Sequence, residues 1–203
     1  ITVNEKDPVR LSTLRKQGFK SVLNQDGRLP FIGPRYDAIV TNPPFGSSPE
    51  RMYGRYRIGG LDEQMSINAL QSMNDNGRAA IIIGGHMSYQ PNGHVKSERI
   101  FINYLYQHYN VVDIINMGGN LYAKQGTTFP TRMILIDGRR MDTDVVRFAP
   151  KESEVDNSVI TNFKDLYNRV NSVKNETVSQ PSEPTPVISR IKLPSGGNNI
   201  PDS

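Results

Sequence analysis

Cysteine is absent from this chain of 203 residues. Disulfide bonds and thiolate metal sites are therefore excluded, and the composition fits a reducing compartment, so that we expect a cytoplasmic protein. Long apolar runs are also absent. None approaches the roughly 20 residues that a membrane-spanning helix needs, and no signal peptide is recognisable. The sequence thus argues against a membrane protein and against a disulfide-stabilised secreted protein.

The sequence also lacks a strong imbalance of charge. Lysine and arginine number 24 against 20 acidic residues, which gives a net charge of +4 and an isoelectric point near 9.3. This balance permits a phosphate-rich partner without requiring one, because many basic proteins bind no nucleic acid. The length suffices for one domain with a sizeable core, plus a tail. Because the first residue is Ile1, we expect a piece of a longer protein.

The most informative stretch is a short strand followed by a double proline. Residues 36–41 are mostly apolar and β-branched near their end, which is typical of a buried strand. Asn42-Pro43-Pro44-Phe45 follows, and two successive prolines cannot continue a sheet, because they lack amide hydrogens and have fixed φ angles. The pattern predicts a stiff loop at the carboxyl end of a strand, which is the edge where open α/β sheets bind ligands.

This loop offers specific chemistry for an amine. The Asn42 side-chain oxygen and the Pro43 carbonyl are hydrogen-bond acceptors, and neither proline supplies a competing amide donor. Two convergent acceptors suit an amino group, and the flat face of Phe45 suits a stacked base. The loop resembles the Asn-Pro-Pro-Phe motif of the amino-methyltransferases that use S-adenosylmethionine, above all the DNA adenine methyltransferases. The alternative is an ordinary Asn-Pro turn after a strand.

The elements before the motif follow the order of this family. Residues 1–5 end a strand at Glu5, residues 7–18 are typical of a capped helix, and residues 19–23 form a second strand, followed by Asp26. By resemblance, Glu5 matches the acid of the second motif, which binds the ribose hydroxyls of the cofactor. Asp26 matches the acid of the third motif, which binds the cofactor's adenine amine. The alternative for each is a solvated loop carboxylate.

One part of the family pattern is missing. The first motif, a strand with a Gly-x-Gly turn that cradles the methionine part of the cofactor, should precede Ile1. In this fold that strand lies at the centre of the sheet, between the strands that end at Glu5 and Thr41. We therefore expect two unpaired sheet edges and no useful cofactor binding by this chain alone. Because this motif is missing, a second function remains open for the chain: a non-catalytic, methylase-like module that docks DNA or assists assembly.

Residues 46–60 are expected to form a loop in which arginines alternate with tyrosines. Arginine suits phosphate and tyrosine can stack on an unpaired base, so that this loop is assigned to substrate contact. The alternative is a mobile, solvated loop. The candidate substrate-binding residues are Arg51, Tyr53, Arg55, Tyr56 and Arg57.

Four further elements are expected after this loop. The pattern predicts a helix over residues 61–76 that ends at Gly77 and a buried strand over residues 79–83. A helix capped by Ser97 follows, and then a strand over residues 111–115.

A loop over residues 118–130 precedes the last strand, over residues 131–136, which we expect to be antiparallel to its neighbour. This pair of strands with an aromatic, threonine-rich loop resembles the eighth motif of the family, whose loop packs against the flipped adenine. Tyr122 or Phe129 is then the expected packing residue. A hairpin loop with core aromatics is the alternative.

The resemblance covers residues 1–140 and implies a partial catalytic core with an α/β fold. Its sheet would be the class I, Rossmann-like methyltransferase sheet, mostly parallel with an antiparallel last strand and helices on both faces. Residues 141–174 are expected to form a connecting segment with one helix. Residues 175–203 are rich in Ser, Pro, Asn, Thr and Gly, which indicates a linker or disordered tail.

The resemblance implies methyl transfer from S-adenosylmethionine to the exocyclic amine of adenine in DNA, as in restriction–modification systems. The target base would leave the duplex, and Phe45 would stack on it while Asn42 and Pro43 hold its amine. No metal is needed, because the sulfonium is already activated and positioning supplies the gain. An RNA base amine and a protein glutamine amide remain open as acceptors. Residues 36–140 are especially similar to the methylase part of large phage and mobile-element proteins, which implies a helicase domain in the same parent chain.

Overall fold

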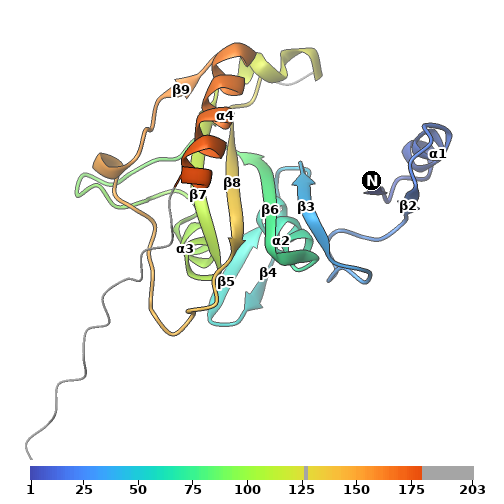
Figure 1. Ribbon diagram of the computed structural model, residues 1–203, viewed down its shortest axis with the longest axis horizontal. Coiled ribbons are helices and arrows are strands. Elements are labelled where there is room, and N and C mark those ends of the chain that lie inside the picture. Colours follow the sequence, from blue (N-terminus) through green and yellow to red (C-terminus); the bar gives the residue numbers. More distant parts are fainter. Residues whose placement is uncertain (126–127, 180–203) are drawn as a thin grey trace, which may run out of the picture.

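A five-stranded sheet forms the centre of the computed structural model, which describes residues 1–125 and 128–179 (Figure 1). β3 is parallel to β6 and β9 is parallel to β7, whereas β8 is antiparallel to both of its neighbours. The predicted α/β sheet with an antiparallel last strand is therefore confirmed. In spatial order the strands are β3 (Tyr36–Thr41), β6 (Met73–Gly84), β8 (Thr131–Arg139), β7 (Tyr109–Met117) and β9 (Val159–Ile160).

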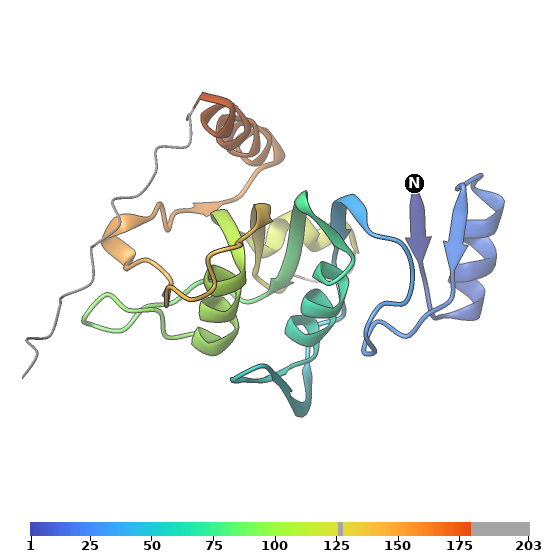
Figure 2. The same ribbon diagram turned by 60° about the horizontal axis from the view of Figure 1, so that its bottom comes forward.

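Helices cover both faces of this sheet. α2 (Leu61–Leu70) and α3 (Arg99–His108) lie on one face, and α4 (Phe163–Ser179) lies on the other (Figure 2). The larger core, under α2 and α3, includes Ile67, Leu70, Ile81, Ile83, Phe101, Ile102, Leu105 and Ile134. The smaller core, under α4, includes Ile115, Met117, Leu121, Leu135 and Ile160. Burial of these apolar side chains holds the helices against both faces of the sheet.

A separate, two-stranded sheet precedes β3. β1 (Thr2–Asn4) and β2 (Ser21–Leu23) pair in parallel, and α1 (Pro8–Lys16) connects them. α1 begins as predicted, because the Asp7 carboxylate accepts hydrogen bonds from two amides of the first turn, at 3.1 and 2.9 Å. Gly18, with a φ of +75°, follows its end.

β1 and β3 are the facing edge strands of these two sheets. β1 lies between β2 and the central sheet (Figure 2), and no described strand pairs with β3 on the side away from β6. Val40, in the second half of β3, is accordingly 83% exposed. The structure thus has the two unpaired edges that the sequence analysis predicts, and β3 is less buried than expected.

The residues after the double proline form a hairpin rather than the expected loop. β4 (Ser47–Tyr53) and β5 (Tyr56–Gly60) are antiparallel, and Gly54 has the positive φ of +60° that their tight turn requires. The base of the hairpin adjoins the double proline, and its tip packs against Tyr104 of α3.

The helix that was expected to reach residue 76 is shorter. α2 ends at Leu70, the hydroxyl of Ser72 donates to the Ala69 carbonyl at 2.6 Å, and Met73 already begins β6. Gly77 therefore does not end a helix. It lies inside β6, where a Cβ would approach the Tyr36 carbonyl oxygen to 3.1 Å, so that glycine allows β6 and β3 to lie close together.

α3 also begins differently from the prediction. Its N-cap is Glu98, with a left-handed φ of +42°, whereas the hydroxyl of Ser97 accepts a hydrogen bond from the Ser88 amide at 3.0 Å. A non-glycine residue in this region is strained by about 1 kcal/mol or more. The ion pair between the Glu98 side chain and Arg132, described below, compensates for this strain.

The segment after β8 packs onto the sheet. Residues 143–147 hydrogen-bond to Gln107 of α3, β9 extends the sheet beyond β7, and α4 covers the second core. α4 continues to Ser179, into the stretch expected to be a linker, and residues 180–203 lie outside the described part. Among the described helices, none is long and apolar enough to cross a membrane.

Candidate methyltransferase site

The Asn-Pro-Pro-Phe loop lies at the carboxyl end of β3, as predicted. Pro43 is buried, Phe45 is half-buried, and Asn42 and Pro44 are exposed. The Leu61 amide donates to the Gly46 carbonyl at 2.8 Å, which ties the end of the loop to the start of α2. The Asn42 side chain makes no hydrogen bond to any described residue, so its acceptor oxygen is available to a ligand.

Two aromatic rings meet beside this loop. Phe45 and Phe129 have centroids 6.1 Å apart with an interplanar angle of 36°. Both rings press on Gly84 at the end of β6, where a Cβ would lie 3.1 Å from Phe45 and 3.3 Å from Phe129. The structure therefore brings together residues that the sequence assigned to two different motifs. The side chain of Tyr122, the other candidate in the second motif, lies outside the described residues.

Phe45→Ala is expected to weaken binding of DNA that carries an unpaired adenine by about 1–3 kcal/mol, because a stacked base typically contributes that much. The measurement is a fluorescence titration with an oligonucleotide that contains one extrahelical 2-aminopurine. Phe148→Ala, which removes a phenylalanine that is 70% exposed on another segment, is the matched control. An unchanged affinity in Phe45→Ala would contradict the stacking role.

An ionic cluster around a buried arginine adjoins the aromatic pair, and no pattern in the sequence indicates it. Arg132 is fully buried at the start of β8 and donates to the carbonyls of Gly85 and His86, at 3.3 and 3.1 Å. Its guanidinium also pairs with Glu98 at 2.5 Å. The Asp62 carboxylate accepts from the Gly84 amide at 3.0 Å. Two buried charged side chains, Arg132 of β8 and Asp62 of α2, therefore hold residues 84–86 next to the Phe45–Phe129 pair.

Glu63 is a second buried carboxylate of this cluster. It accepts a hydrogen bond from the Gly60 amide at 3.1 Å, in front of α2. Burial raises the pKa of Glu63 to about 7, and the nearby negative charges of Glu98 and Asp62 act in the same direction. Glu63 thus changes its charge near neutral pH inside the wall of the candidate site.

Glu63→Gln is expected to remove a pH dependence of stability. Because the pKa of Glu63 is higher in the folded state than its ordinary value of 4.5, the unfolded chain ionises first. The wild type therefore loses stability as the pH rises from about 4.5 to 7, by up to about 3 kcal/mol. Urea unfolding at pH 5 and pH 8 measures this loss, which should be much smaller in Glu63→Gln. The same loss in both proteins would contradict a perturbed Glu63.

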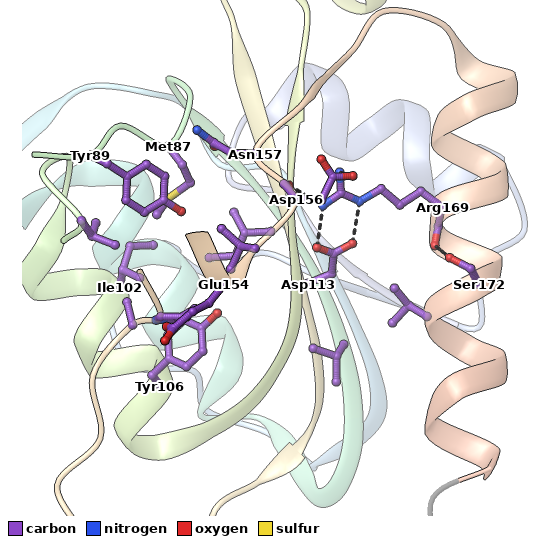
Figure 3. Close-up of a pocket in the computed structure, with 17 residues that line it drawn as sticks. Met87, Tyr89, Ile102, Tyr106, Asp113, Glu154, Asp156, Asn157, Arg169 and Ser172 are labelled. Carbon is purple, nitrogen blue, oxygen red and sulfur yellow. Dashed lines mark hydrogen bonds and ion pairs between the residues drawn. The ribbon is translucent and has the colours of Figure 1, made fainter. Parts of the chain in front are cut away.

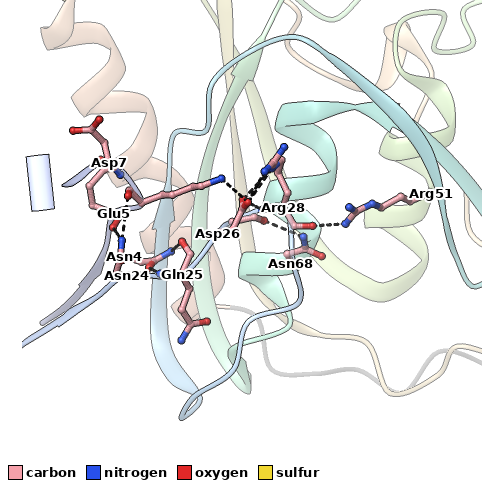
Figure 4. Close-up of polar contacts among 11 residues, drawn as sticks. Asn4, Glu5, Asp7, Asn24, Gln25, Asp26, Arg28, Arg51 and Asn68 are labelled. Atoms are coloured by element: carbon pink, nitrogen blue, oxygen red, sulfur yellow. Dashed lines mark hydrogen bonds and ion pairs between the residues drawn. The ribbon is translucent and has the colours of Figure 1, made fainter. Parts of the chain in front are cut away.

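The two acids assigned to the cofactor lie at the carboxyl ends of β1 and β2 (Figure 4). Glu5 accepts from the Asp7 amide at 2.8 Å and faces Arg10 at 3.3 Å. Asp26 pairs with Lys6 at 2.7 Å and with Arg28 at 2.6 Å. The Lys6–Asp26 pair joins the loops that follow the two strands, so that the structure brings the predicted acids to one edge.

The carboxylate of Asp26 is held in its charged form. The hydrogen bonds from Arg28 and then those from Lys6 lower its pKa well below the ordinary range. Both cations are more than half exposed, so that these ion pairs can be exchanged for a ligand at little cost. The loop that contains Asp26 is attached to α2, because the Asn68 side chain donates to the Gly27 carbonyl at 3.0 Å.

The five hairpin residues assigned to substrate contact divide into two groups. Tyr53 and Tyr56 pack edge-on against Tyr104, with centroids 6.2 and 5.4 Å from it, and so form part of the core. The arginines lie outside. Arg57 faces Glu50 at 3.5 Å, and Arg55 lies 5.2 Å from the Tyr56 ring centroid. Arg51 donates to the Arg28 carbonyl, which links the hairpin to the loop after β2.

No group of three or more metal-ligating side chains with the geometry for a metal ion is found among residues 1–125 and 128–179.

No protein-family model matches the chain, and no curated protein matches it in sequence. Solved structures do match its fold. One is a protein of Listeria monocytogenes described as a class I S-adenosylmethionine-dependent methyltransferase, with a TM-score of 0.56 and 12% identity over 86% of this chain. Another is a modification subunit of a type I restriction enzyme from Vibrio vulnificus YJ016, with a TM-score of 0.54 and 16% identity over 86% of this chain. The class I methyltransferase fold is thereby established.

The chain spans 54% of the Listeria protein and 41% of the Vibrio protein.

Proposed function

We propose that this chain is part of an S-adenosylmethionine-dependent methyltransferase that modifies the exocyclic amine of adenine in DNA. The observation that carries the proposal is the position of the Asn42–Phe45 loop. It lies at the carboxyl end of β3, in a class I methyltransferase fold, with an acceptor oxygen free of described partners and with two phenylalanine rings beside it.

The residues present fit the cofactor in part. Glu5 and Asp26 are carboxylates at the ends of adjacent strands, and their exposed ion pairs leave them able to accept hydrogen bonds from a ribose diol and an adenine amine. When bound, the cofactor supplies an activated methyl group on a sulfonium. By the resemblance, the methionine end needs the glycine turn of a strand between the unpaired edges of β1 and β3, so that this chain alone should bind the cofactor weakly.

The chain's own residues would act on the acceptor amine by positioning it. The Asn42 side-chain oxygen and the Pro43 carbonyl would each accept one hydrogen of the amine. With both hydrogens held, the nitrogen lone pair is directed out of the plane of the base, toward an incoming methyl group. Phe45 would fix the plane of the base by stacking. Holding two reactants in this way can lower a barrier by several kcal/mol, up to about 10.

Several features support DNA as the acceptor. The net charge of +4 and the exposed hairpin arginines suit a phosphate backbone. The partly exposed Phe45–Phe129 pair suits a base that has left the stack. The likeness to a modification subunit of a restriction enzyme agrees with such a substrate.

The test is methyl transfer from labelled cofactor by the full-length protein that contains this chain. Double-stranded DNA, RNA and protein are offered as acceptors, and nucleoside analysis identifies the product. We expect N6-methyladenine in DNA. Label in an RNA base or in a protein glutamine would support the proposed role of Asn42 and would contradict DNA as the substrate. No transfer to any acceptor, with cofactor binding demonstrated, would contradict an enzymatic function.

Neutralising the exposed hairpin arginines is expected to flatten the salt dependence of DNA binding. Each lost phosphate contact should lower the slope of log affinity against log salt by about 0.9, because fewer counterions are released. Arg55→Gln/Arg57→Gln is the preferred variant, since Arg51 has a structural contact with the Arg28 carbonyl. Lys151→Gln/Lys164→Gln removes the same charge elsewhere and is the control. Equal slopes in the hairpin variant and the control would show that the hairpin arginines do not contact the DNA phosphates.

A further inference from the structure

A cavity of about 350 Å³ lies beside β7, toward the end of the sheet opposite β3 (Figure 3). Its walls come from β7, α3, α4, the loop after β6 and residues 149–157. β9 pairs with β7 only through Asn116 and Met117. The chain that leads into β9 therefore stands away from the rest of the β7 edge, and the cavity lies between them. Of the described residues assigned to the methyltransferase site, none lines it.

The charged groups of the cavity leave it acidic. Arg169 donates two hydrogen bonds to the Asp113 carboxylate, at 2.8 Å each, one to the Asp156 carboxylate at 3.0 Å and one to the Asp156 carbonyl at 2.9 Å. This cation is therefore saturated by its own partners and is a poor site for an anion. Glu154 adds a further carboxylate, whose described partner is the Lys151 amide at 2.8 Å. Three carboxylates against one guanidinium give the lining a net charge of about −2, in a chain whose net charge is +4.

Two tyrosines supply the aromatic part of the lining. The rings of Tyr89 and Tyr106 border the cavity (Figure 3). Neither hydroxyl makes a hydrogen bond to a described residue. Burial raises the pKa of Tyr106 and that of Tyr89 above the ordinary value of a phenol, so that both stay neutral. Partly buried hydroxyls without protein partners are groups that a ligand can satisfy.

We propose that this cavity binds an organic cation carried on an aliphatic chain, that is, an alkyl ammonium or guanidinium group. The faces of Tyr89 and Tyr106 attract a cation, and their oxygens can accept its hydrogens. Glu154 provides a charge-assisted partner. Val112 and Val173 of the lining are partly exposed and offer apolar surface for the aliphatic chain. A carboxylate or phosphate ligand would meet the excess negative charge instead.

Two sources carry this chemistry, a free polyamine and an arginine side chain of a protein. The experiment offers spermidine, N-acetyl-arginine amide and N-acetyl-citrulline amide to the isotopically labelled 203-residue chain and follows the tyrosine resonances by NMR. Citrulline has the shape of arginine without its charge, so that it isolates the contribution of the cation. Saturable shifts of Tyr89 and Tyr106 are expected with at least one of the two cations and not with citrulline. Whichever cation binds more tightly identifies the source.

Two variants link binding to the cavity. Tyr106→Phe keeps the ring and removes one acceptor, and Glu154→Gln keeps an acceptor and removes the charge. Each should weaken cation binding about tenfold, the loss expected for one hydrogen bond to a charged group. Asp144→Asn, an exposed residue outside the lining, removes the same charge and should leave binding unchanged. Equal binding of citrulline, no saturable shift with either cation, or equal weakening by Asp144→Asn would overturn the proposal.

Discussion

Asn42→Ala is expected to abolish methyl transfer by the full-length protein while leaving its fold intact. The side chain is exposed at the end of β3 and makes no hydrogen bond to any residue in the described ranges, so that its loss removes no packing. In the proposed reaction its oxygen holds one hydrogen of the acceptor amine. Loss of an oriented group of this kind typically lowers turnover on the order of a hundredfold or more.

Two further variants test whether Asn42 acts as a hydrogen-bond acceptor. Asn42→Asp keeps an acceptor oxygen and should retain more activity than Asn42→Ala. Asn92→Ala changes an asparagine in the turn that ends at His94 and should leave turnover unchanged. Rates are measured under single-turnover conditions, with cofactor binding and circular dichroism measured on the same samples. Near-normal turnover by Asn42→Ala would refute the assignment of the catalytic loop.

Glu98→Ala is expected to destabilise the fold by about 3–5 kcal/mol, the usual effect of leaving a buried charge without its partner. Arg132 has no exposed surface, and Glu98 is its acidic partner at 2.5 Å. The remaining contacts of this guanidinium are the carbonyls of Gly85 and His86, which cannot neutralise it. Urea denaturation measures the loss.

Two comparisons make this prediction specific. Glu50→Ala breaks the Arg57–Glu50 pair, in which both side chains are more than half exposed, and should cost at most about 1 kcal/mol. Glu98→Ala/Arg132→Met replaces both charges and should recover part of the stability lost in Glu98→Ala, because no unpaired cation remains. A loss in Glu98→Ala no larger than that in Glu50→Ala would show that Arg132 is not held by this pair.

Local signals in the sequence predicted the elements that carry the site. Two prolines end β3 because neither can donate to a ladder, and Asp7 begins α1 because its carboxylate caps two amides. The structure brings together Phe45 and Phe129, which the sequence assigned to two motifs without predicting their contact. The proposed roles of Glu5 and Asp26 and of the hairpin arginines stay predictions.

The errors in element boundaries have a common cause. Leu61, Met65, Ala69 and Met73 fall at four-residue spacing, which favours a helix up to residue 76. Met73 is buried in β6 instead. An apolar residue at this position fits both the helical pattern and the alternating pattern of a strand. In the same way, Tyr53 and Tyr56 alternate with arginines as exposed loop residues would, although Tyr104 of a distant helix buries them.

The ionic cluster behind the aromatic pair could not be predicted from the sequence. Its members lie on different elements, and Glu98 and Arg132 are separated by 34 positions in the chain. A charged residue is exposed in most sequence contexts, so that the burial of Arg132 becomes evident only after β8 is placed between β6 and β7.

The open edge of β3 has a consequence for hydrogen exchange. The amides of an edge strand are protected on one side only, so β3 should exchange faster than β6 or β8, which lie inside the sheet. The Asn42 loop is the direct continuation of this strand, and its order is coupled to that of β3. Any ligand or chain segment that binds along the open edge and slows exchange in β3 should therefore slow exchange at Phe45 and Gly46 as well, and the two protections should rise together in one titration.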